Sequence, residues 1–156
     1  VKPDVVIMGK ALSGGVMPVS AVAASAEVLG VFKPGDHGST FGGSPLACAV
    51  ACAAMAVIRD ENLAERSEEL GVYFRQRLTA INSPLVACIR GKGLLNAAQL
   101  KPDSAKTARQ CCEELMAKGI LCKETHEDVI RFAPPLIISK EDLDWALDQI
   151  EAVLAG

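Results

Sequence analysis

The chain has 156 residues and a formal net charge of −3, and half of its residues are hydrophobic. This composition can bury a core, which excludes a disordered tail. Because the 16 Lys and Arg residues are balanced by 19 Asp and Glu and form no basic block, we expect no nucleic acid and no membrane as partner.

The chain opens with Val1-Lys2-Pro3-Asp4 and shows no initiator Met or signal peptide, so we expect a piece of a longer protein. Its most apolar stretch, residues 45–58, is too short to span a bilayer. The six cysteines lack C-x-x-C spacing, which argues against a metal site. We expect them to be free, buried and in a reducing compartment, which indicates the cytoplasm.

The first part of the chain predicts elements of an α/β layer. Val5–Met8 is a continuous apolar run, typical of a strand buried on both faces of a largely parallel sheet. A second apolar segment covers residues 18–24. Residues 33–43 hold four glycines and a proline, so we expect a loop. Ser44-Pro45 then predicts the start of an Ala-rich helix to about residue 59, whose apolarity implies burial.

After residue 60 the pattern becomes amphipathic and then mixed. Apolar residues at helical spacing predict a helix over 62–81, and residues 86–90 and 94–100 predict a β-hairpin. We expect a helix over 105–117 ended by Lys118-Gly119, short strands at 120–122 and 129–132, and a last helix capped by Ser139 with Asp142. The chain therefore divides into residues 1–59, the end of an α/β domain, and residues 60–156, a small α+β domain with a mainly antiparallel sheet.

Lys10 is the first candidate for chemistry because it stands just after the predicted strand Val5–Met8, which ends at Gly9. Ligands of doubly wound sheets bind at the carboxyl ends of the strands, so this amine is expected at a crevice. A lysine there can attack an aldehyde and form a Schiff base. The alternative is a strand-end lysine that simply reaches solvent. A Walker A loop is excluded, because its lysine follows the glycines whereas Lys10 precedes Gly14 and Gly15.

Two further positions carry candidate binding groups. Ser39 and Thr40 lie in a glycine-rich loop before a helix, a setting that favours a phosphate, although an ordinary turn is the alternative. Arg131 stands among apolar residues and needs a carboxylate partner. That partner is either structural, Glu127 or Asp128, or the carboxylate of a substrate. For His126, Arg90 and Lys92 we expect structural or solvated roles.

Three segments, residues 4–15, 37–47 and 123–136, together with Arg90-Gly91-Lys92-Gly93-Leu94, resemble the ornithine aminotransferases. This family belongs to the pyridoxal-phosphate aminotransferases that act on ω-amines. The resemblance implies a fold-type-I PLP-dependent transferase, with residues 1–59 ending its large domain and residues 60–156 forming its small C-terminal domain. Ser44 stands where the family usually has Asn, and Ser is also a good N-cap.

The resemblance also implies roles for single residues. Lys10 would bind pyridoxal 5'-phosphate as a Schiff base and carry the proton during catalysis. Ser39 and Thr40 would bind the phosphate of the cofactor in the neighbouring subunit, so the enzyme would be a homodimer or a higher homo-oligomer. Arg131 would hold the α-carboxylate of glutamate or 2-oxoglutarate. The implied reaction moves the δ-amino group of L-ornithine to 2-oxoglutarate and gives glutamate 5-semialdehyde and glutamate.

Two alternatives stay open at this point. Acetylornithine and 4-aminobutyrate aminotransferases share the lysine, the Thr loop and the arginine, although residues 10–19 and 123–135 look more like the ornithine enzymes. Family members are longer, and the part absent here carries most contacts to the ω-amine substrate. A catalytically silent folding or dimerisation module is the alternative from a different class.

Overall fold

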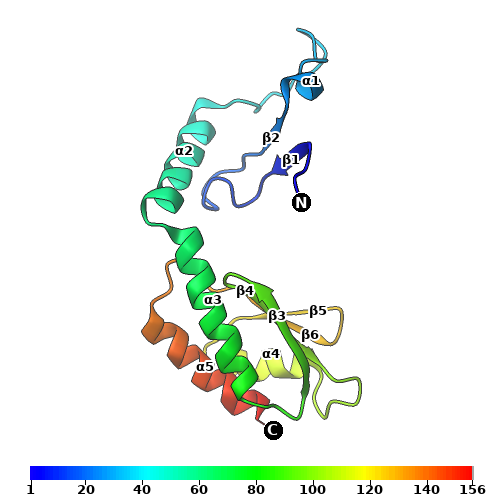
Figure 1. The fold of residues 1–156 in the computed structure, drawn as a ribbon, viewed down its shortest axis with the longest axis vertical. Coiled ribbons are helices and arrows are strands. Elements are labelled where there is room, and N and C mark those ends of the chain that lie inside the picture. Colours follow the sequence, from blue (N-terminus) through cyan, green and yellow to red (C-terminus); the bar gives the residue numbers. More distant parts are fainter. Residues whose placement is uncertain (156) are drawn as a thin grey trace. The chain divides into compact units, whose positions relative to one another are not determined.

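A computed structural model describes residues 1–155 and divides the chain into two compact units, Val1–Glu61 (unit 1) and Asn62–Gly156 (unit 2). Figure 1 shows the order of helices and strands along the chain. Within residues 1–155, no helix combines the length and the apolar character needed to cross a membrane.

Unit 1 contains a two-stranded sheet and two helices. Strands β1 (Val5–Met8) and β2 (Ala21–Ala24) pair antiparallel, with Met8 opposite Ala21. Helix α1 (Ala26–Leu29) was not predicted, and α2 (Pro45–Asp60) begins at Pro45 with Ser44 at its N-cap, as predicted. The segment between the two helices is irregular, which confirms the predicted loop.

Two burial predictions for unit 1 are wrong. The predicted strand forms, but β1 pairs with an antiparallel neighbour and exposes its apolar side chains, with Ile7 79% exposed. Helix α2 exposes Leu46, Met55 and Val57, and Ala47 is its buried residue. An apolar run shows that a segment favours burial, but the elements that cover it are set by the rest of the fold.

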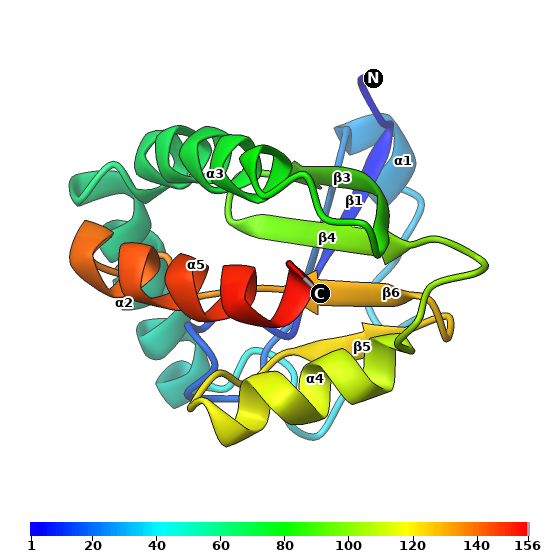
Figure 2. The same cartoon turned by 90° about the horizontal axis from the view of Figure 1, so that it is seen from below.

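Unit 2 is a four-stranded antiparallel sheet in the order β3-β4-β6-β5, with three helices. Its elements are α3 (Leu63–Ala80), β3 (Val86–Lys92), β4 (Leu95–Leu100), α4 (Ala108–Ala117), β5 (Lys123–Thr125), β6 (Val129–Phe132) and α5 (Lys140–Leu154). The hairpin, the strand at 129–132 and the antiparallel sheet are confirmed. Figure 2 shows α3, α4 and α5 laid along one face of this sheet.

The core of unit 2 lies between that sheet face and the helices. Ile130 and Phe132 of β6 point into it, as do Phe74 of α3, Leu115 of α4 and Leu147 of α5. Side chains alternate along a strand, so Arg131, between two core positions, lies on the opposite face of the sheet and is exposed. This side of the sheet is the outer face.

The two ends of helix α4 explain two departures from the sequence predictions. Helix α4 begins at Ala108 because Thr107 and Gln110 form a capping box. At its other end Gly119, with φ +87°, lets the Ile120 N–H donate to the Leu115 carbonyl at 2.9 Å. The strand predicted at 120–122 is therefore wrong: the cap takes the Ile120 amide, residues 120–122 are irregular, and β5 forms at Lys123–Thr125 instead. The predicted cap of α5 is confirmed, since Ser139 Oγ accepts from the Asp142 N–H at 2.9 Å.

The expectation that all cysteines are buried is wrong for three of them. Cys48, Cys52 and Cys88 are exposed, whereas Cys111 and Cys112 are buried and Cys122 is half-buried. Burial and the neighbouring Cys112 thiol raise the pKa of Cys122 to about 12. In the described residues all six are free, and no cluster of three or more His, Cys, Asp or Glu side chains could hold a metal ion.

Candidate functional site

Lys10 lies two residues after β1, in a backbone conformation that is unfavourable for a residue with a side chain. Its φ is +56°, in the left-handed region, which costs roughly 1–2 kcal/mol for a non-glycine residue. Strained backbone of this kind clusters at functional sites, where the surrounding fold maintains it. The side chain is exposed and lines a pocket of about 420 Å³ in unit 1.

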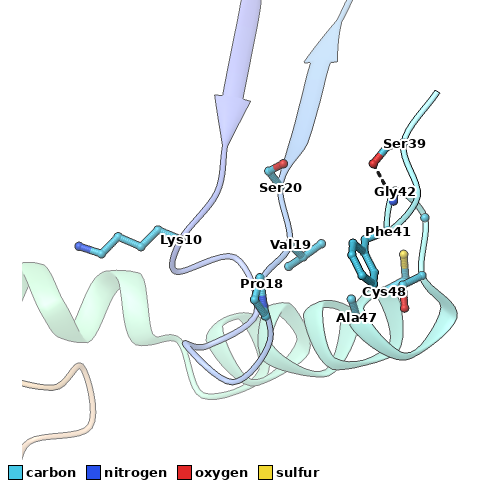
Figure 3. Close-up of a pocket in the computed structure, with 11 residues that line it drawn as sticks. Lys10, Pro18, Val19, Ser20, Ser39, Phe41, Gly42, Ala47 and Cys48 are labelled. Carbon is cyan, nitrogen blue, oxygen red and sulfur yellow. Dashed lines mark hydrogen bonds between the residues drawn. The ribbon is translucent and has the colours of Figure 1, made fainter. Parts of the chain in front are cut away.

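This pocket, called the Lys10 pocket below, has one charged residue among eleven. Its wall consists of Lys10, residues 18–20 before β2, Ser39, residues 41–44, and Ala47 and Cys48 of α2. Figure 3 shows the side chain of Lys10 extending away from Ser39 and Gly42. The antiparallel pairing of β1 with β2 brings Ser20 next to the end of β1, a neighbour that the sequence did not reveal because it assigned no partner strand to Val5–Met8.

The predicted phosphate loop forms a tight turn at the other end of the Lys10 pocket. Ser39 Oγ accepts a hydrogen bond from the Gly42 N–H at 3.0 Å, drawn in Figure 3. A Cβ on Gly42 would lie 2.9 Å from Cβ of Ser39, and Gly43 has φ +71°, so this turn requires both glycines. The structure therefore brings Ser39 into the pocket with Lys10. Thr40 is exposed on the same turn and is outside the set of lining residues.

Arg131 belongs to unit 2, on the outer face of β6. The expectation that it is surrounded by apolar residues is wrong, because strand alternation sends Ile130 and Phe132 into the core and leaves Arg131 exposed. Among residues 1–155 its guanidinium makes no ion pair and no hydrogen bond. Asp128, one of the two structural partners considered, instead accepts a hydrogen bond from Gln99 Nε2 at 2.9 Å.

Arg131 shares a pocket of about 330 Å³ with Arg90 and Lys92 on the outer face. Arg90 Nη1 donates to Gln99 Oε1 at 2.7 Å, and Lys92 Nζ lies 2.8 Å from Glu68 Oε2 of α3. The hydrogen bond from Lys92 holds the pKa of Glu68 below its usual range. Arg90 and Lys92 thus have partners within their own unit, whereas Arg131 has none among residues 1–155.

The turn between β3 and β4 is packed directly against α3. Gly71 of α3 lies so close that a Cβ there would be 1.9 Å from the Gly93 carbonyl oxygen. Arg75 Nη1 donates to that carbonyl at 3.0 Å and to Oδ1 of the buried Asn96 at 2.8 Å. These contacts fix the strand ends that carry Arg90 and Lys92.

Residues 1–154 match the aminotransferase class-III family, and the chain belongs to this family. The fold is the C-terminal part of a fold-type-I PLP-dependent transferase. The chain is 60% identical over 154 residues to an ornithine aminotransferase of Brevibacillus brevis and 59% identical over 152 residues to that of Bacillus subtilis. The match to the Brevibacillus brevis protein covers 99% of this chain and 38% of that relative, and the match to the Bacillus subtilis protein covers 97% and 37%. The chain thus spans less than half of the length of these relatives.

Two solved structures extend the comparison. An ornithine aminotransferase from Toxoplasma gondii, described with PLP at its active site, is 46% identical with a TM-score of 0.93, over 98% of this chain and 37% of its own. An acetylornithine aminotransferase from Elizabethkingia anophelis is 50% identical with a TM-score of 0.91, over 99% of this chain and 41% of its own. The family's cofactor is pyridoxal 5'-phosphate.

The Lys10 pocket fits that cofactor in its chemistry. An amine that can bind an aldehyde and a glycine turn with a hydroxyl that can bind a phosphate line the same hollow, and the other lining residues are neutral. The hollow also adjoins the N-terminus of α2, where backbone N–H groups favour an anion.

Proposed function

We propose that this chain carries the cofactor-binding lysine of an ω-amine aminotransferase, and that the complete enzyme transfers the δ-amino group of L-ornithine to 2-oxoglutarate. The products would be glutamate 5-semialdehyde and glutamate. The observation that carries the proposal is the position of Lys10. This residue has a strained backbone at a strand end, and it is the charged residue of an otherwise neutral pocket that also contains the glycine turn with Ser39. The names of the relatives with 56–60% identity support ornithine as the amine donor.

Each proposed residue has a distinct task. Pyridoxal phosphate, when bound, supplies an aldehyde and a ring that accepts electrons from the substrate carbon. Lys10 Nζ would hold the aldehyde carbon, and the amine, once released by the substrate, would move the proton at the reacting carbon. Ser39 and Thr40 would bind the phosphate. For the subunit assembly we propose a homodimer, in which the two hydroxyls serve the neighbouring site.

Arg131 would hold the substrate through a carboxylate. Its planar guanidinium can grip a carboxylate with two parallel hydrogen bonds, and the lack of any ion pair within residues 1–155 supports this role. The carboxylate would be the α-carboxylate of glutamate or 2-oxoglutarate. The free thiols are compatible with a reducing compartment, and we propose the cytoplasm.

The test of the Lys10 role is borohydride reduction of the complete, cofactor-loaded enzyme followed by peptide mapping. We expect the pyridoxyl label on Lys10, loss of turnover in Lys10→Ala, and normal turnover in the control Lys2→Ala. A label on Lys2, Lys92 or Lys123 would refute the assignment. A colourless protein that takes up no cofactor would instead support the silent-module alternative.

Acetylornithine aminotransferase remains the second candidate, because the Elizabethkingia anophelis structure of that name is 50% identical to the chain. Comparing kcat/KM for ornithine, N-acetylornithine and 4-aminobutyrate in the complete enzyme separates the three possibilities. We expect ornithine to be preferred. A higher value for either other amine would replace the proposed substrate while leaving the Lys10 assignment intact.

A further inference from the structure

Ser13 stands out in unit 1 because its hydroxyl group is completely buried. Ser13 and Ala47 are the two buried residues among residues 1–61. The Ser13 Oγ donates to the Met17 carbonyl and accepts a hydrogen bond from the Met17 N–H at 3.1 Å. A hydroxyl can donate and accept at the same time, so this one side chain satisfies both backbone groups of Met17. This pair of hydrogen bonds is called the Ser13 clamp.

The Ser13 clamp belongs to a loop that is closed by its own hydrogen bonds. The Gly14 N–H donates to the Ala11 carbonyl at 3.0 Å, and the Val16 N–H donates to the Ser13 carbonyl at 3.3 Å. Together with the clamp, these bonds connect residues 11–17, which we call the Ser13 loop. Unit 1 has almost no core, so local hydrogen bonds are the contacts that hold this loop in one shape.

Both ends of the Ser13 loop lead into the Lys10 pocket. At one end Pro18 directly follows the loop, and residues 18–20 form the pocket wall before β2. At the other end Gly9 and Lys10 are the two residues that separate the loop from β1. Figure 3 shows the chain passing from Lys10 through this loop and back to Pro18. A change in the shape of the loop is therefore transmitted to Lys10 through one peptide bond.

The backbone of Lys10 is restrained from both directions. Strand pairing holds Met8 opposite Ala21, and the Ser13 clamp holds the loop that begins at Ala11. Lys10 lies between these two restrained points and has a φ of +56°. The left-handed conformation is unfavourable for a lysine, so the surrounding structure must maintain it. Without the Ser13 clamp the loop gains freedom, and Lys10 can relax to an ordinary backbone angle.

We propose that Ser13 is a positioning residue, which holds Lys10 in the backbone conformation that presents its amine to the aldehyde of the cofactor. This inference rests on the proposed role of Lys10. The amine and the aldehyde condense, so that a C=N bond replaces the C=O bond and one water molecule leaves. If a smaller fraction of the protein holds Lys10 in this conformation, the apparent affinity for the aldehyde falls in proportion. Ser13 is outside the set of residues that line the pocket, so we expect it to act through Lys10.

The test compares two ligands that differ in one substituent. Pyridoxal 5'-phosphate carries the aldehyde, whereas pyridoxine 5'-phosphate carries an alcohol that cannot condense with an amine. Each ligand is titrated by calorimetry into the complete enzyme after its cofactor has been removed. In Ser13→Ala we expect Kd for pyridoxal phosphate to rise about five- to thirtyfold, the factor that matches the cost of one left-handed residue. Kd for pyridoxine phosphate should equal that of the parent, which also shows that the variant is folded.

Two further variants complete the experiment. Ser25→Ala makes the same substitution at an exposed serine of unit 1 whose side chain makes no capping hydrogen bond, and it should bind both ligands like the parent. In Lys10→Ala the amine is absent, so the addition of Ser13→Ala should change neither Kd any further. An effect of Ser13 that does not pass through Lys10 would persist in this double variant and would refute the proposal.

The outcomes separate this inference from the proposed function. If Lys10→Ala weakens the binding of pyridoxal phosphate but Ser13→Ala does not, the positioning role is refuted and the Lys10 assignment stands. The same conclusion follows if Ser13→Ala weakens both ligands equally. If Lys10→Ala binds pyridoxal phosphate as tightly as the parent, the Lys10 assignment itself fails, and the inference fails with it.

Discussion

The two units use their apolar residues in opposite ways. Unit 2 gathers sixteen buried residues into one core, whereas among residues 1–61 only Ser13 and Ala47 are buried. Burying apolar surface stabilises a fold by roughly 25 cal/mol per Å², so unit 2 has a source of stability within its own sequence and unit 1 has little. We therefore expect the stability of this chain to reside in unit 2.

The same contrast separates the candidate site residues. Lys10, Ser39 and Thr40 stand on exposed segments of unit 1, in turns that depend on positive φ angles and on glycines. Arg131 stands on a strand whose flanking residues, Ile130 and Phe132, are locked into a core. The residues proposed to bind the cofactor thus depend on local backbone geometry, and the residue proposed to bind the substrate depends on packing.

The largest effect should come from opening the core of unit 2. Leu143→Ala removes a fully buried side chain and should cost about 2–5 kcal/mol. Met55→Ala in unit 1 is the matched control, because Met55 is 50% exposed and its truncation should change stability by less than about 0.5 kcal/mol. Trp145, the single tryptophan, lies in unit 2, so its fluorescence during urea unfolding reports this comparison. Equal losses in both variants would contradict it.

The next effect concerns the contact between α3 and the β3–β4 turn. Gly71→Ala would usually strengthen a helix by about 1 kcal/mol. Here the new Cβ would lie 1.9 Å from the Gly93 carbonyl oxygen, so we expect a net loss of about 1–3 kcal/mol from overpacking. In unit 1 a Cβ on Gly38 meets no atom within 4 Å among the described residues, and Gly38→Ala should be nearly neutral. If Gly71→Ala raises the free energy of unfolding, the β3–β4 turn can move away from the new Cβ and the expected overpacking is absent.

The sequence predicted unit 2 better than unit 1 for a physical reason. The helix α3 stripe, the hairpin and the cap of α5 are local patterns, and the neighbours that bury them lie within the same unit. The apolar run of β1 is also a local pattern, but it does not indicate which elements cover these side chains. The strand predicted at 120–122 does not form, because the helix cap at Gly119 takes the amide of Ile120, and β5 forms at Lys123–Thr125 instead.

The candidate site shows the same limit. Lys10 was identified from its position after an apolar strand, but its left-handed backbone and the antiparallel neighbour Ser20 follow from the folded pairing. Arg131 was identified as a cation that needs a carboxylate partner. Gln99 links Arg90, which stands 9 residues before it, to Asp128, which stands 29 residues after it. This link was not predictable from the sequence, because it depends on two specific side-chain orientations.

A smaller effect of opposite sign should come from the turn between β5 and β6. His126 and Glu127 both have positive φ, at +53° and +66°. Glycine adopts this conformation at little cost, so Glu127→Gly should stabilise unit 2 by about 1 kcal/mol. The same substitution on the exposed side of α3, Glu69→Gly, should instead destabilise it by about 1 kcal/mol. If both variants lose stability to the same degree in urea, the strain assigned to Glu127 is absent.

The smallest effect should be a pH dependence confined to unit 2, at the contact between α3 and α5. Hydrogen bonds from Lys140 and Tyr73 hold the pKa of Asp144 below its usual value of 3.8. A carboxyl whose pKa is lower in the folded state stabilises the fold above its unfolded pKa, and this contribution disappears as the pH falls through the folded value. The parent should therefore melt at a higher temperature than Asp144→Asn near neutral pH, and the gap should close below about pH 3.8. The melting curves are followed by Trp145 fluorescence. The control Asp103→Asn, at an exposed carboxylate of unit 2, should melt like the parent at every pH. If the difference in melting temperature between the parent and Asp144→Asn stays constant down to pH 2, the ionic origin of the effect is refuted.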